Sequence, residues 1–306
     1  MEKKNLVSII VTTKNEEKNI ENCLLSIKSQ TYKPIEIIIV DNFSTDRTKE
    51  IAVKYTNLVY EKGPERSAQR NYGMIEKSSG EYLMYVDADM ILSPSLLEGC
   101  VMAFQNNPEW VALHIPEVIL GKNFWSKVRR FERFFYNGTV IDGARFFRKE
   151  FFLKTGGFDL SFSGVEDWDM DKMIKKFGKI GLLSFRENIP EKSSLHSFLT
   201  RHGIKPSRYG ACIYHNESEF LLTKYLKKKK YYAETFSPYI EKWGKSDQDL
   251  KKQFGFLYRY FIVFLENGKW KRLLMHPILT TGMYFLRILV GLMLLLSKTK
   301  RSPHAH

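Results

Sequence analysis

Two aspartates separated by a single residue follow a short apolar segment. Asp87 and Asp89 come directly after Tyr82–Val86, whose residues are typical of a buried strand. Carboxylates this close repel each other unless a cation lies between them. Hard oxygen ligands suit Mg²⁺ or Mn²⁺ held jointly by carboxylate and phosphate. A D-x-D pair is also common in surface turns, so its place after an apolar strand is what favours a metal site.

A second group of acids lies further along the chain, after a pair of glycines. Asp159, Glu166, Asp167 and Asp169 place four carboxylates within eleven residues. Acids at a helix start also satisfy the helix dipole, which is the simpler explanation. On a chain of net charge +14, the same cluster suits a general base that nearby cations keep ionised.

Two polar loops complete the set of residues that could do chemistry. Thr12–Glu17 follows the first apolar run, and Asp41–Asp46 follows the second. The first loop is also a capped helix start, with Thr13 or Asn15 as the N-cap. The second is also a turn in which Asp, Asn and Ser side chains bond to the backbone. Asp41 is well placed to accept hydrogen bonds from a base or a ribose hydroxyl.

The elements that must position these residues follow from the hydrophobic pattern. Leu6–Thr12 and Glu36–Val40 have the composition of strands, and Glu16–Ser29 carries apolar residues at helical spacing. Strand, helix and strand in this order form a βαβ unit, which implies a parallel sheet. The alternation continues through Asp46–Tyr55, Asn57–Tyr60, Ser67–Ser78 and Tyr82–Val86. We therefore predict an α/β fold, and open parallel sheets bind ligands outside the carboxyl ends of their strands.

The remainder of the chain is more mixed. The pattern predicts strands at Val111–Ile115 and Ala144–Arg148, and helices at Phe124–Tyr136 and Glu166–Phe177. Beyond about residue 205 the sequence becomes basic, aromatic and helical. We predict an α/β domain over residues 1–205, a basic helical extension over 206–275 and an apolar helix over 276–298.

The polar motifs occur in the same order and at similar spacing in the family 2 glycosyltransferases, which have the GT-A fold. The chain resembles this family over roughly residues 5–200. The matching segments are Val11–Glu16, Asp41–Thr48, Ala68–Gly73, Asp87–Asp89 and Gly156–Asp167. Each segment alone is a loose match, but five in order are specific. The resemblance implies a Rossmann-like, mostly parallel sheet.

The resemblance also implies which residues bind the donor nucleotide sugar. Thr12, Asn15 and Glu16 would line the nucleotide pocket, and Asp41 would contact the base. Arg70 would lie near the nucleotide or its phosphates. Because Lys14 stands where the family more often has an aromatic residue or an arginine, UDP- and GDP-linked donors both remain open.

Metal binding and catalysis are implied in the same way. Asp87 would contact the ribose or the metal, and Asp89 would coordinate the Mn²⁺ or Mg²⁺ that bridges the diphosphate. His196 lies where many members have a histidine or arginine near the metal or diphosphate. Asp167 would be the general base that deprotonates the acceptor hydroxyl, with Glu166 as its neighbour or rival.

The expected reaction follows from this chemistry. Displacing a nucleoside diphosphate from an anomeric carbon builds negative charge on the leaving phosphates, which a bound metal offsets. One base and no enzyme nucleophile give a single displacement, hence inversion, so we expect an inverting hexosyltransferase of glycan or polysaccharide assembly. One rival is a sugar-nucleotide-forming nucleotidyltransferase, although Thr12–Glu17 lacks the usual glycines. Another is a non-catalytic nucleotide-sugar-binding protein. Nucleic-acid binding rests only on charge and is not expected.

Two apolar segments favour a membrane surface as a partner. Phe124–Tyr136 is aromatic and basic, and Pro277–Ser297 is almost wholly apolar with Arg287 as its only charge. The second segment is long enough to cross a bilayer, but basic residues on both sides favour a helix in the interface. Lys227–Lys230 would contact anionic lipid. We expect a monotopic, peripheral or single-pass protein at the cytoplasmic face of the membrane, with a glycan- or polyprenyl-linked acceptor.

The cysteines and the N-terminus agree with this location. Cys23, Cys100 and Cys212 are far apart and odd in number, which predicts buried thiols in a reducing compartment. No apolar leader precedes the first strand, so we expect no secretory signal.

Overall fold

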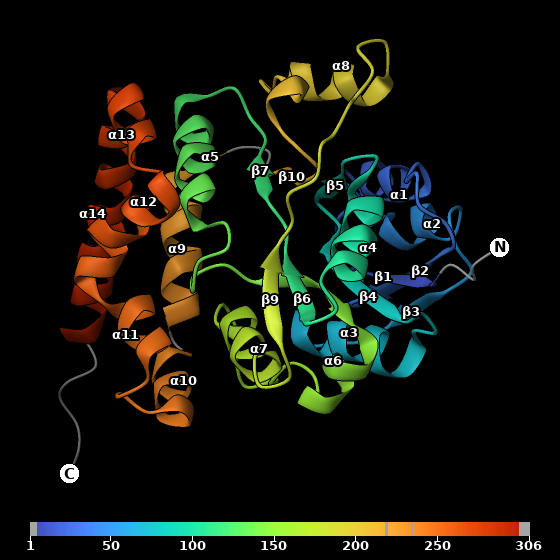
Figure 1. The fold of residues 1–306 in the computed structure, drawn as a ribbon, viewed down its shortest axis with the longest axis horizontal. Helices are drawn as coiled ribbons and strands as arrows, with labels where there is room; N and C mark the ends of the chain where they lie inside the picture. The colour runs from blue at the N-terminus through green and yellow to red at the C-terminus, as the bar shows by residue number, and fades with distance from the viewer. Residues whose placement is uncertain (1–4, 218–219, 234, 300–306) are drawn as a thin grey trace.

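The computed structural model describes residues 5–217, 220–233 and 235–299. Its centre is a seven-stranded sheet of order β3-β2-β1-β4-β8-β6-β9 (Figure 1). The strands are β1 (Val7–Thr13), β2 (Ile35–Asp41), β3 (Val59–Glu61), β4 (Tyr82–Asp87), β6 (Trp110–His114), β8 (Ala144–Arg148) and β9 (Lys179–Leu182). The first four run parallel, β8 is antiparallel to both its neighbours, and β9 is parallel to β6. This confirms the predicted mostly parallel α/β sheet.

The central strand β1 is apolar on both faces. All seven of its residues are buried, as in parallel sheets that are covered on both sides. Thr12 lies beside Asp87 of β4, and Thr13 lies beside Asp41 of β2. The strand ends that carry the predicted site residues therefore meet at one edge of the sheet.

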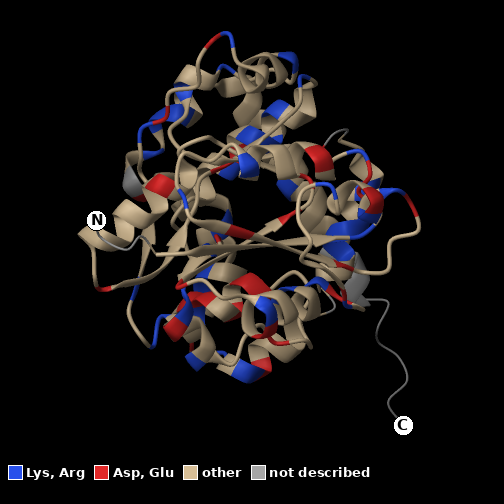
Figure 2. Ribbon diagram, turned by 90° about the vertical axis from the view of Figure 1, so that its right-hand side faces the viewer, with Lys and Arg blue, Asp and Glu red and all other residues tan. Residues whose placement is uncertain are grey.

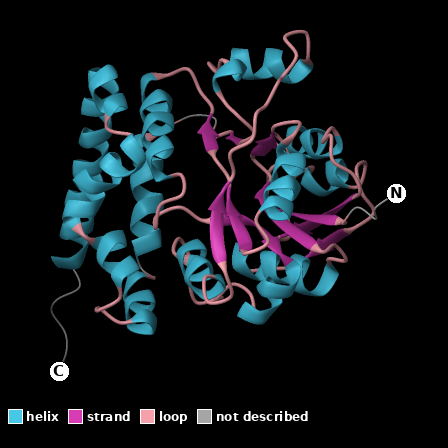
Figure 3. Ribbon diagram, viewed as in Figure 1, coloured by secondary structure: helices cyan, strands magenta, loops and turns pink. Residues whose placement is uncertain are grey.

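Helices cover both faces of this sheet (Figure 3). One layer consists of α1 (Ile20–Lys28), α2 (Thr48–Ala52) and α4 (Leu96–Asn106). The other consists of α3 (Arg66–Asn71) with its π-helical continuation η1 (Tyr72–Lys77), α6 (Lys149–Thr155) and α7 (Glu166–Ile174). Gly73 allows η1 to approach β1, since a Cβ there would lie only 2.6 Å from Cγ2 of Ile10.

A second, three-stranded sheet connects distant parts of the chain. Its strands are β5 (Met90–Leu92), β10 (Ile213–His215) and β7 (Glu117–Ile119), in the order β5-β10-β7. Strand β10 is antiparallel to β5 and parallel to β7, and α8 (Ser194–Arg201) and η2 (Pro206–Arg208) precede it. Although β10 lies beyond residue 205, where we predict the first domain to end, it returns the chain to the loop after β4.

The C-terminal part forms a layer of helices beside the α/β domain (Figure 1). Its elements are α9 (Leu222–Ala233), α10 (Phe236–Trp243), α11 (Gln248–Phe254), η3 (Tyr258–Ile262), α12 (Val263–Leu265), η4 (Glu266–Gly268), α13 (Lys271–Met275) and α14 (Pro277–Thr299). Helix α5 (Phe124–Tyr136) joins this layer. Val128 and Phe135 of α5 pack with Phe264 of α12 and with Met283 and Leu286 of α14. The two segments expected at a membrane therefore bury part of their apolar surface against each other.

Arg287, the only charge in the long apolar segment, points into this layer. Its Nε lies 3.0 Å from Oε1 of Glu132 on α5, and its guanidinium also contacts the Tyr136 hydroxyl and the Arg259 carbonyl oxygen. Burial alone would raise the pKa of Glu132, but Arg287 and Arg129 outweigh it and lower the pKa to about 2. Arg287 thus ties α14 to α5. Within the described ranges, no helix combines the length and apolarity needed to cross a membrane.

The cysteines are buried, as the sequence predicts, and charges of both signs lie on the surface. Cys23, Cys100 and Cys212 are free thiols and all are buried. Basic and acidic residues are interspersed over the side of the molecule shown in Figure 2.

Candidate active site

The loops that follow β1 and β2 are bonded to each other. Asn15 has a positive φ of 54°, a conformation that asparagine tolerates better than most residues. Its backbone N–H donates to Oγ of Ser44 at 2.8 Å, and its side-chain Oδ1 accepts from the Thr45 N–H at 2.8 Å. The Glu16 N–H donates to Oγ1 of Thr48 at 2.8 Å. The two loops predicted to bind the nucleotide therefore form one wall.

Asp41 and Glu16 occupy different positions in that wall. Asp41 is fully buried, and its two oxygens accept from the Ser44 N–H at 2.6 Å and the Ser44 hydroxyl at 2.5 Å. It therefore holds the turn of its own loop, and its contact with a base stays a prediction. Glu16 accepts a 2.7 Å hydrogen bond from Nδ2 of Asn19. Burial raises the pKa of Glu16, and the negative charge of Asp89 raises it further. The hydrogen bond from Asn19 lowers this pKa but does not outweigh the other two effects.

Asp87 lies at the end of β4 among cationic and hydroxyl partners. Oγ1 of Thr12 donates to its Oδ1 at 3.0 Å, and Nη2 of Arg70 lies 3.5 Å from the same oxygen. Nη1 of Arg145 is 4.0 Å from Oδ2. Burial would raise the pKa of Asp87, but Arg70 and Arg145 outweigh it and hold the pKa well below its usual range. Asp87 is therefore an ionised carboxylate whose charge arginines compensate.

Asp89 faces a histidine from the second sheet. Its Oδ2 lies 3.2 Å from Nε2 of His215, and Nδ1 of that histidine lies 2.7 Å from Oε1 of Glu117. Burial would lower the pKa of His215, but Asp89 and Glu117 raise it well above its ordinary value. The other oxygen of Asp89, Oδ1, is buried and has no hydrogen-bond partner among the described residues.

His215, rather than the predicted His196, is the histidine placed against Asp89. His196 lies on α8, where its backbone N–H donates to the N-cap hydroxyl of Ser193 at 3.1 Å. None of the contacts described for His196 reaches Asp87 or Asp89. The sequence has a hint of His215, because it directly follows Ile213 and Tyr214 in a short strand-like run. Only the pairing of β10 with β5 brings it to the aspartates.

Asp167 is fixed through one of its two oxygens. Nη1 of Arg70 lies 2.9 Å from Oδ1, and the Tyr85 hydroxyl donates to the same oxygen at 2.8 Å. Arg70 is 1% exposed, and its guanidinium lies over the Tyr85 ring at 4.0 Å from the centroid. Arg70 also contacts Asp87. One buried guanidinium therefore places the predicted base and the predicted metal motif on the same side of the molecule.

Glu166 and Asp167 differ in what surrounds their carboxylates. Glu166 is buried, pairs with Nε of Arg66 at 2.8 Å and accepts from the Gly164 N–H. Burial and the charge of Asp167 raise the pKa of Glu166. The Asp167 side chain is 31% exposed, and among the described residues no hydrogen bond to its Oδ2 is found. Burial would raise the pKa of Asp167, but Arg70 and Arg145 outweigh it and lower the pKa.

These positions can be compared with those of known proteins. Residues 8–164, just over half of the chain, match the family model described as Glycosyl transferase family 2. This chain is a family 2 glycosyltransferase. The match spans the loops after β1 and β2, the Asp87–Asp89 pair and Arg70, and it ends just before Glu166.

Curated relatives match parts of this glycosyltransferase. Glycosyltransferase AglE of Haloferax volcanii is 40% identical over 92 residues, which cover 27% of this chain and 30% of that protein. A PGL/p-HBAD biosynthesis glycosyltransferase of Mycobacterium bovis is 27% identical over 175 residues, covering 54% of this chain and 68% of that protein. The chain thus spans about a third of the length of the first of these relatives.

A solved structure supports the fold over nearly the whole chain. The mannosyltransferase PcManGT of Pyrobaculum calidifontis, solved with GDP-Man and Mn²⁺, superimposes with a TM-score of 0.58 at 18% identity. The match covers 95% of this chain and 85% of that one. This confirms the predicted GT-A fold.

Arg145 is a residue of this glycosyltransferase site that the sequence reasoning missed. Its Nη2 lies 3.6 Å from Oε2 of Glu117, and its guanidinium lies 5.2 Å from the centroid of the Tyr85 ring. Its Nη1 is buried without a hydrogen-bond partner in the described part of the chain. An arginine directly before Phe146 and Phe147 in the strand Ala144–Arg148 is the signal that could have found it.

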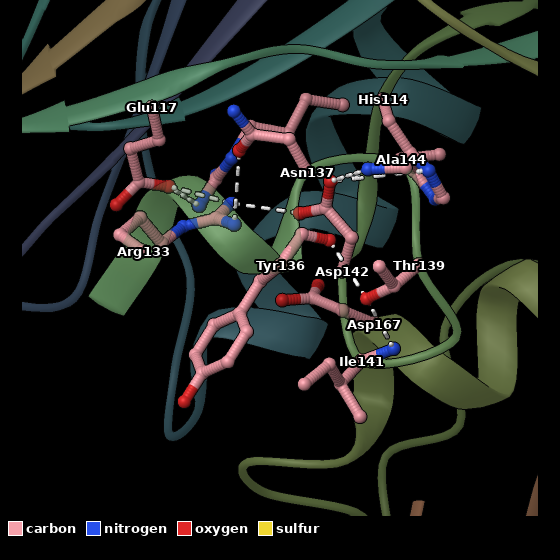
Figure 4. A network of polar contacts seen from close by, with 12 residues as sticks. His114, Glu117, Arg133, Tyr136, Asn137, Thr139, Ile141, Asp142, Ala144 and Asp167 are labelled. Atoms are coloured by element: carbon pink, nitrogen blue, oxygen red, sulfur yellow. Dashed lines mark hydrogen bonds and ion pairs between the residues drawn. The ribbon is translucent and has the colours of Figure 1, made fainter. Parts of the chain in front are cut away.

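A buried polar network lies behind the site (Figure 4). Nη2 of Arg133 on α5 lies 3.4 Å from Oε2 of Glu117 and donates to Oδ1 of Asp142 at 2.7 Å. Nε2 of His114 lies 2.6 Å from Oδ2 of Asp171 on α7, and Oδ1 of Asp171 accepts from the Ala144 N–H. The network links the partner of His215 to the strand and helix that hold Asp167, so both ends of the site rest on one rigid support.

Proposed function

We propose that this family 2 glycosyltransferase moves a hexose from a nucleoside diphosphate sugar to an acceptor hydroxyl or phosphate by a single inverting displacement. The observation that carries the proposal is the buried Arg70, which contacts both Asp87 and Asp167. In-line displacement needs the leaving diphosphate and the base on opposite sides of the anomeric carbon. Two carboxylates separated by one guanidinium suit that requirement.

Asp167 would act as the general base. Its free Oδ2 accepts the proton of the acceptor hydroxyl while the acceptor oxygen forms a bond to the anomeric carbon. The bond from that carbon to the diphosphate breaks, and its electron pair leaves with the nucleoside diphosphate. Glu166, which is held by Arg66 and by the Gly164 N–H, would position the start of α7 and take no proton.

Mn²⁺ or Mg²⁺ would bind at Asp89. The orphaned Oδ1 of Asp89 fits a cation ligand, because a buried carboxylate oxygen without a donor is otherwise unfavourable. Across the described residues no three His, Cys, Asp or Glu side chains form a metal site alone, so phosphate oxygens would complete the coordination. Asp89, with Asp87 and His215 beside it, would hold the ion, which would offset the charge of the leaving diphosphate.

The donor nucleotide would lie along the wall formed by the first two loops. Thr12, Asn15 and Glu16 lie on that wall, and Asp41 supports it from behind. UDP- and GDP-linked sugars are both compatible with this arrangement. The similar mannosyltransferase was solved with GDP-Man.

The acceptor would be lipid-linked, either a polyprenyl phosphate or a growing glycan, at the cytoplasmic face of a membrane. Support comes from the helical layer beside the site, in which α14 remains apolar on its outward side. Arg66, which lies next to Glu166 and is 29% exposed in its side chain, would suit a phosphate carried by such an acceptor.

Tyr85 provides a test of how Asp167 is held. In a Tyr85→Phe variant, Asp167 loses a hydrogen bond that favours its ionised form. We expect the acid limb of kcat/KM to move up by about 1 pH unit, with little change in donor affinity. The measurement is the pH dependence of sugar transfer.

Tyr82→Phe is the matched control for this prediction. Tyr82 lies on the same strand, but its hydroxyl accepts from Nδ2 of Asn5 at 2.9 Å, away from the site. We expect the control to keep the wild-type pH profile. An unchanged acid limb in Tyr85→Phe would show that Tyr85 has only a packing role.

The proposed function is tested by screening UDP- and GDP-sugars with Mn²⁺, Mg²⁺ or EDTA. We expect one donor to raise the melting temperature and to be hydrolysed slowly in a metal-dependent manner. The sugar transferred to an acceptor should have the inverted anomeric configuration by NMR. Release of pyrophosphate from a nucleoside triphosphate and a sugar phosphate would instead identify a nucleotidyltransferase. Binding without turnover would identify a non-catalytic protein.

A further inference from the structure

The outward side of α14 carries a stripe of exposed apolar side chains. Ile278, Phe285, Ile288 and Leu292 are spaced by seven, three and four residues, so they lie on one side of the helix. Met283 and Leu286, on the opposite side, are buried against α5 and α12. One face of α14 is thus packed in the protein, and the other is uncovered.

The neighbouring element widens this stripe. The Tyr260 hydroxyl donates to the Arg287 carbonyl oxygen at 2.9 Å, and the Tyr284 hydroxyl donates to the Tyr260 carbonyl oxygen at 2.8 Å, so η3 lies alongside α14. Phe261 and Leu265, from η3 and α12, are also exposed. We call these six residues the outer face: Phe261, Leu265, Ile278, Phe285, Ile288 and Leu292. Their side chains are 47% to 73% exposed, and a patch of this kind is typical of an interaction surface.

The charges around the outer face indicate its partner. Residues 250–299 contain a single acid, Glu266, and three exposed lysines, Lys251, Lys252 and Lys271. Lys271 is exposed and lies in α13, directly before α14, whereas Lys269 donates to carbonyl oxygens of α5 and its C-cap, and Arg272 lies over the Phe134 ring. Apolar side chains beside cations suit a bilayer with anionic head groups. A second copy of the chain would bring the same cations against each other, which opposes pairing.

We propose that the outer face docks on a bilayer that contains anionic lipid, with α14 lying along the membrane surface. The proposal adds a docking surface to the membrane location given under the proposed function. Only the statement about a lipid-linked acceptor rests on that proposed function. Exposed apolar residues would enter the interface, and the flanking cations would contact lipid phosphates.

The helical layer also connects this docking surface to the site. Helix α9 packs against α14, and at its far side the Tyr231 hydroxyl donates to Oε1 of Glu65 at 2.9 Å. The Arg66 guanidinium lies 5.2 Å from the centroid of the Tyr232 ring, and Arg66 pairs with Glu166. One layer of helices therefore separates the docking surface from the residues beside Asp167. A lipid-linked acceptor would reach the base along α9.

Vesicle sedimentation of the full chain tests this proposal. We expect it to sediment with phosphatidylcholine vesicles containing phosphatidylglycerol, less with phosphatidylcholine alone, and less at high salt. An I278E/I288E variant should bind the anionic vesicles at least about tenfold more weakly. The matched control is L25E/V53E, which places the same charges at similarly exposed apolar positions on the α/β domain.

Several results would overturn the proposal, and they are separable from failure of the proposed function. Wild-type protein that stays in the supernatant with anionic vesicles would do so, as would equal losses in the two double variants. Loss of a dimer in I278E/I288E, seen by sedimentation velocity without vesicle binding, would identify a surface for a second copy. Hydrolysis of the donor in solution should be unchanged in I278E/I288E. Absence of hydrolysis in wild-type protein that binds vesicles would count against the proposed function alone.

Discussion

Replacing Asp167 with asparagine is expected to lower kcat for sugar transfer by about 1,000-fold. The amide keeps the size of the side chain and can still meet Arg70 and Tyr85, which contact Oδ1 in the wild type. It cannot accept the acceptor proton at Oδ2. Because the proposed donor contacts lie on other loops, we expect the affinity for the nucleotide sugar to change little. Single-turnover transfer rates, measured beside donor binding by calorimetry, separate the two effects.

Asp159→Asn is the matched control for Asp167→Asn. Both aspartates precede or begin α7, and their side chains are 32% and 31% exposed. Asp159 pairs with Lys242 rather than with Arg70, so its loss should leave transfer near the wild-type rate. Full transfer activity in Asp167→Asn would contradict the assignment of the base, and the acceptor proton would then have to leave to another group.

Replacing Asp89 with asparagine is the second change with a large expected effect. We expect kcat/KM to fall about 100-fold or more, because the proposed ion, which would offset charge on the leaving diphosphate, would be lost. The stabilisation of the protein by nucleoside diphosphate should also lose its dependence on Mn²⁺. A thermal melt with increasing Mn²⁺, at a fixed concentration of UDP or GDP, measures this without any turnover.

The control for Asp89→Asn is another aspartate neutralised far from the site. Asp249 forms a surface ion pair with Lys175 at 3.5 Å, so Asp249→Asn should keep the Mn²⁺ dependence. If Asp89→Asn retains the same Mn²⁺ titration as the wild type, the ion binds elsewhere, and the orphaned oxygen of Asp89 needs another explanation.

The central strands and their site residues could be predicted because local sequence determines them. β1, β2 and β4 are apolar runs of six or seven residues, long enough to be read from composition alone. Parallel strands end at one edge of the sheet, so the positions of Asp41 and Asp87 followed from topology. Arg70 lies 3.5 Å from Asp87, and its position near the nucleotide or its phosphates, which the family resemblance implies, stays a prediction.

What could not be predicted depends on contacts between distant segments. His215 is 126 residues from Asp89, and the three-residue strand that carries it is too short to recognise from its pattern. The sequence shows Arg287 only as the single charge of an apolar segment, because its partner, Glu132, lies on another helix. Arg145 could not be predicted for a similar reason, because its place in the site depends on contacts with Glu117 and Asp87, which lie on other strands.

The pairing of β10 with β5 and β7 sets a lower limit on the length of any active fragment. A protein shortened to residue 205 would retain every motif of the family resemblance, but it would lack His215. It would also leave β5 and β7 without the strand between them, and such open edges invite aggregation. We therefore expect an active fragment of this glycosyltransferase to extend past His215, well beyond residue 164, where the family match ends.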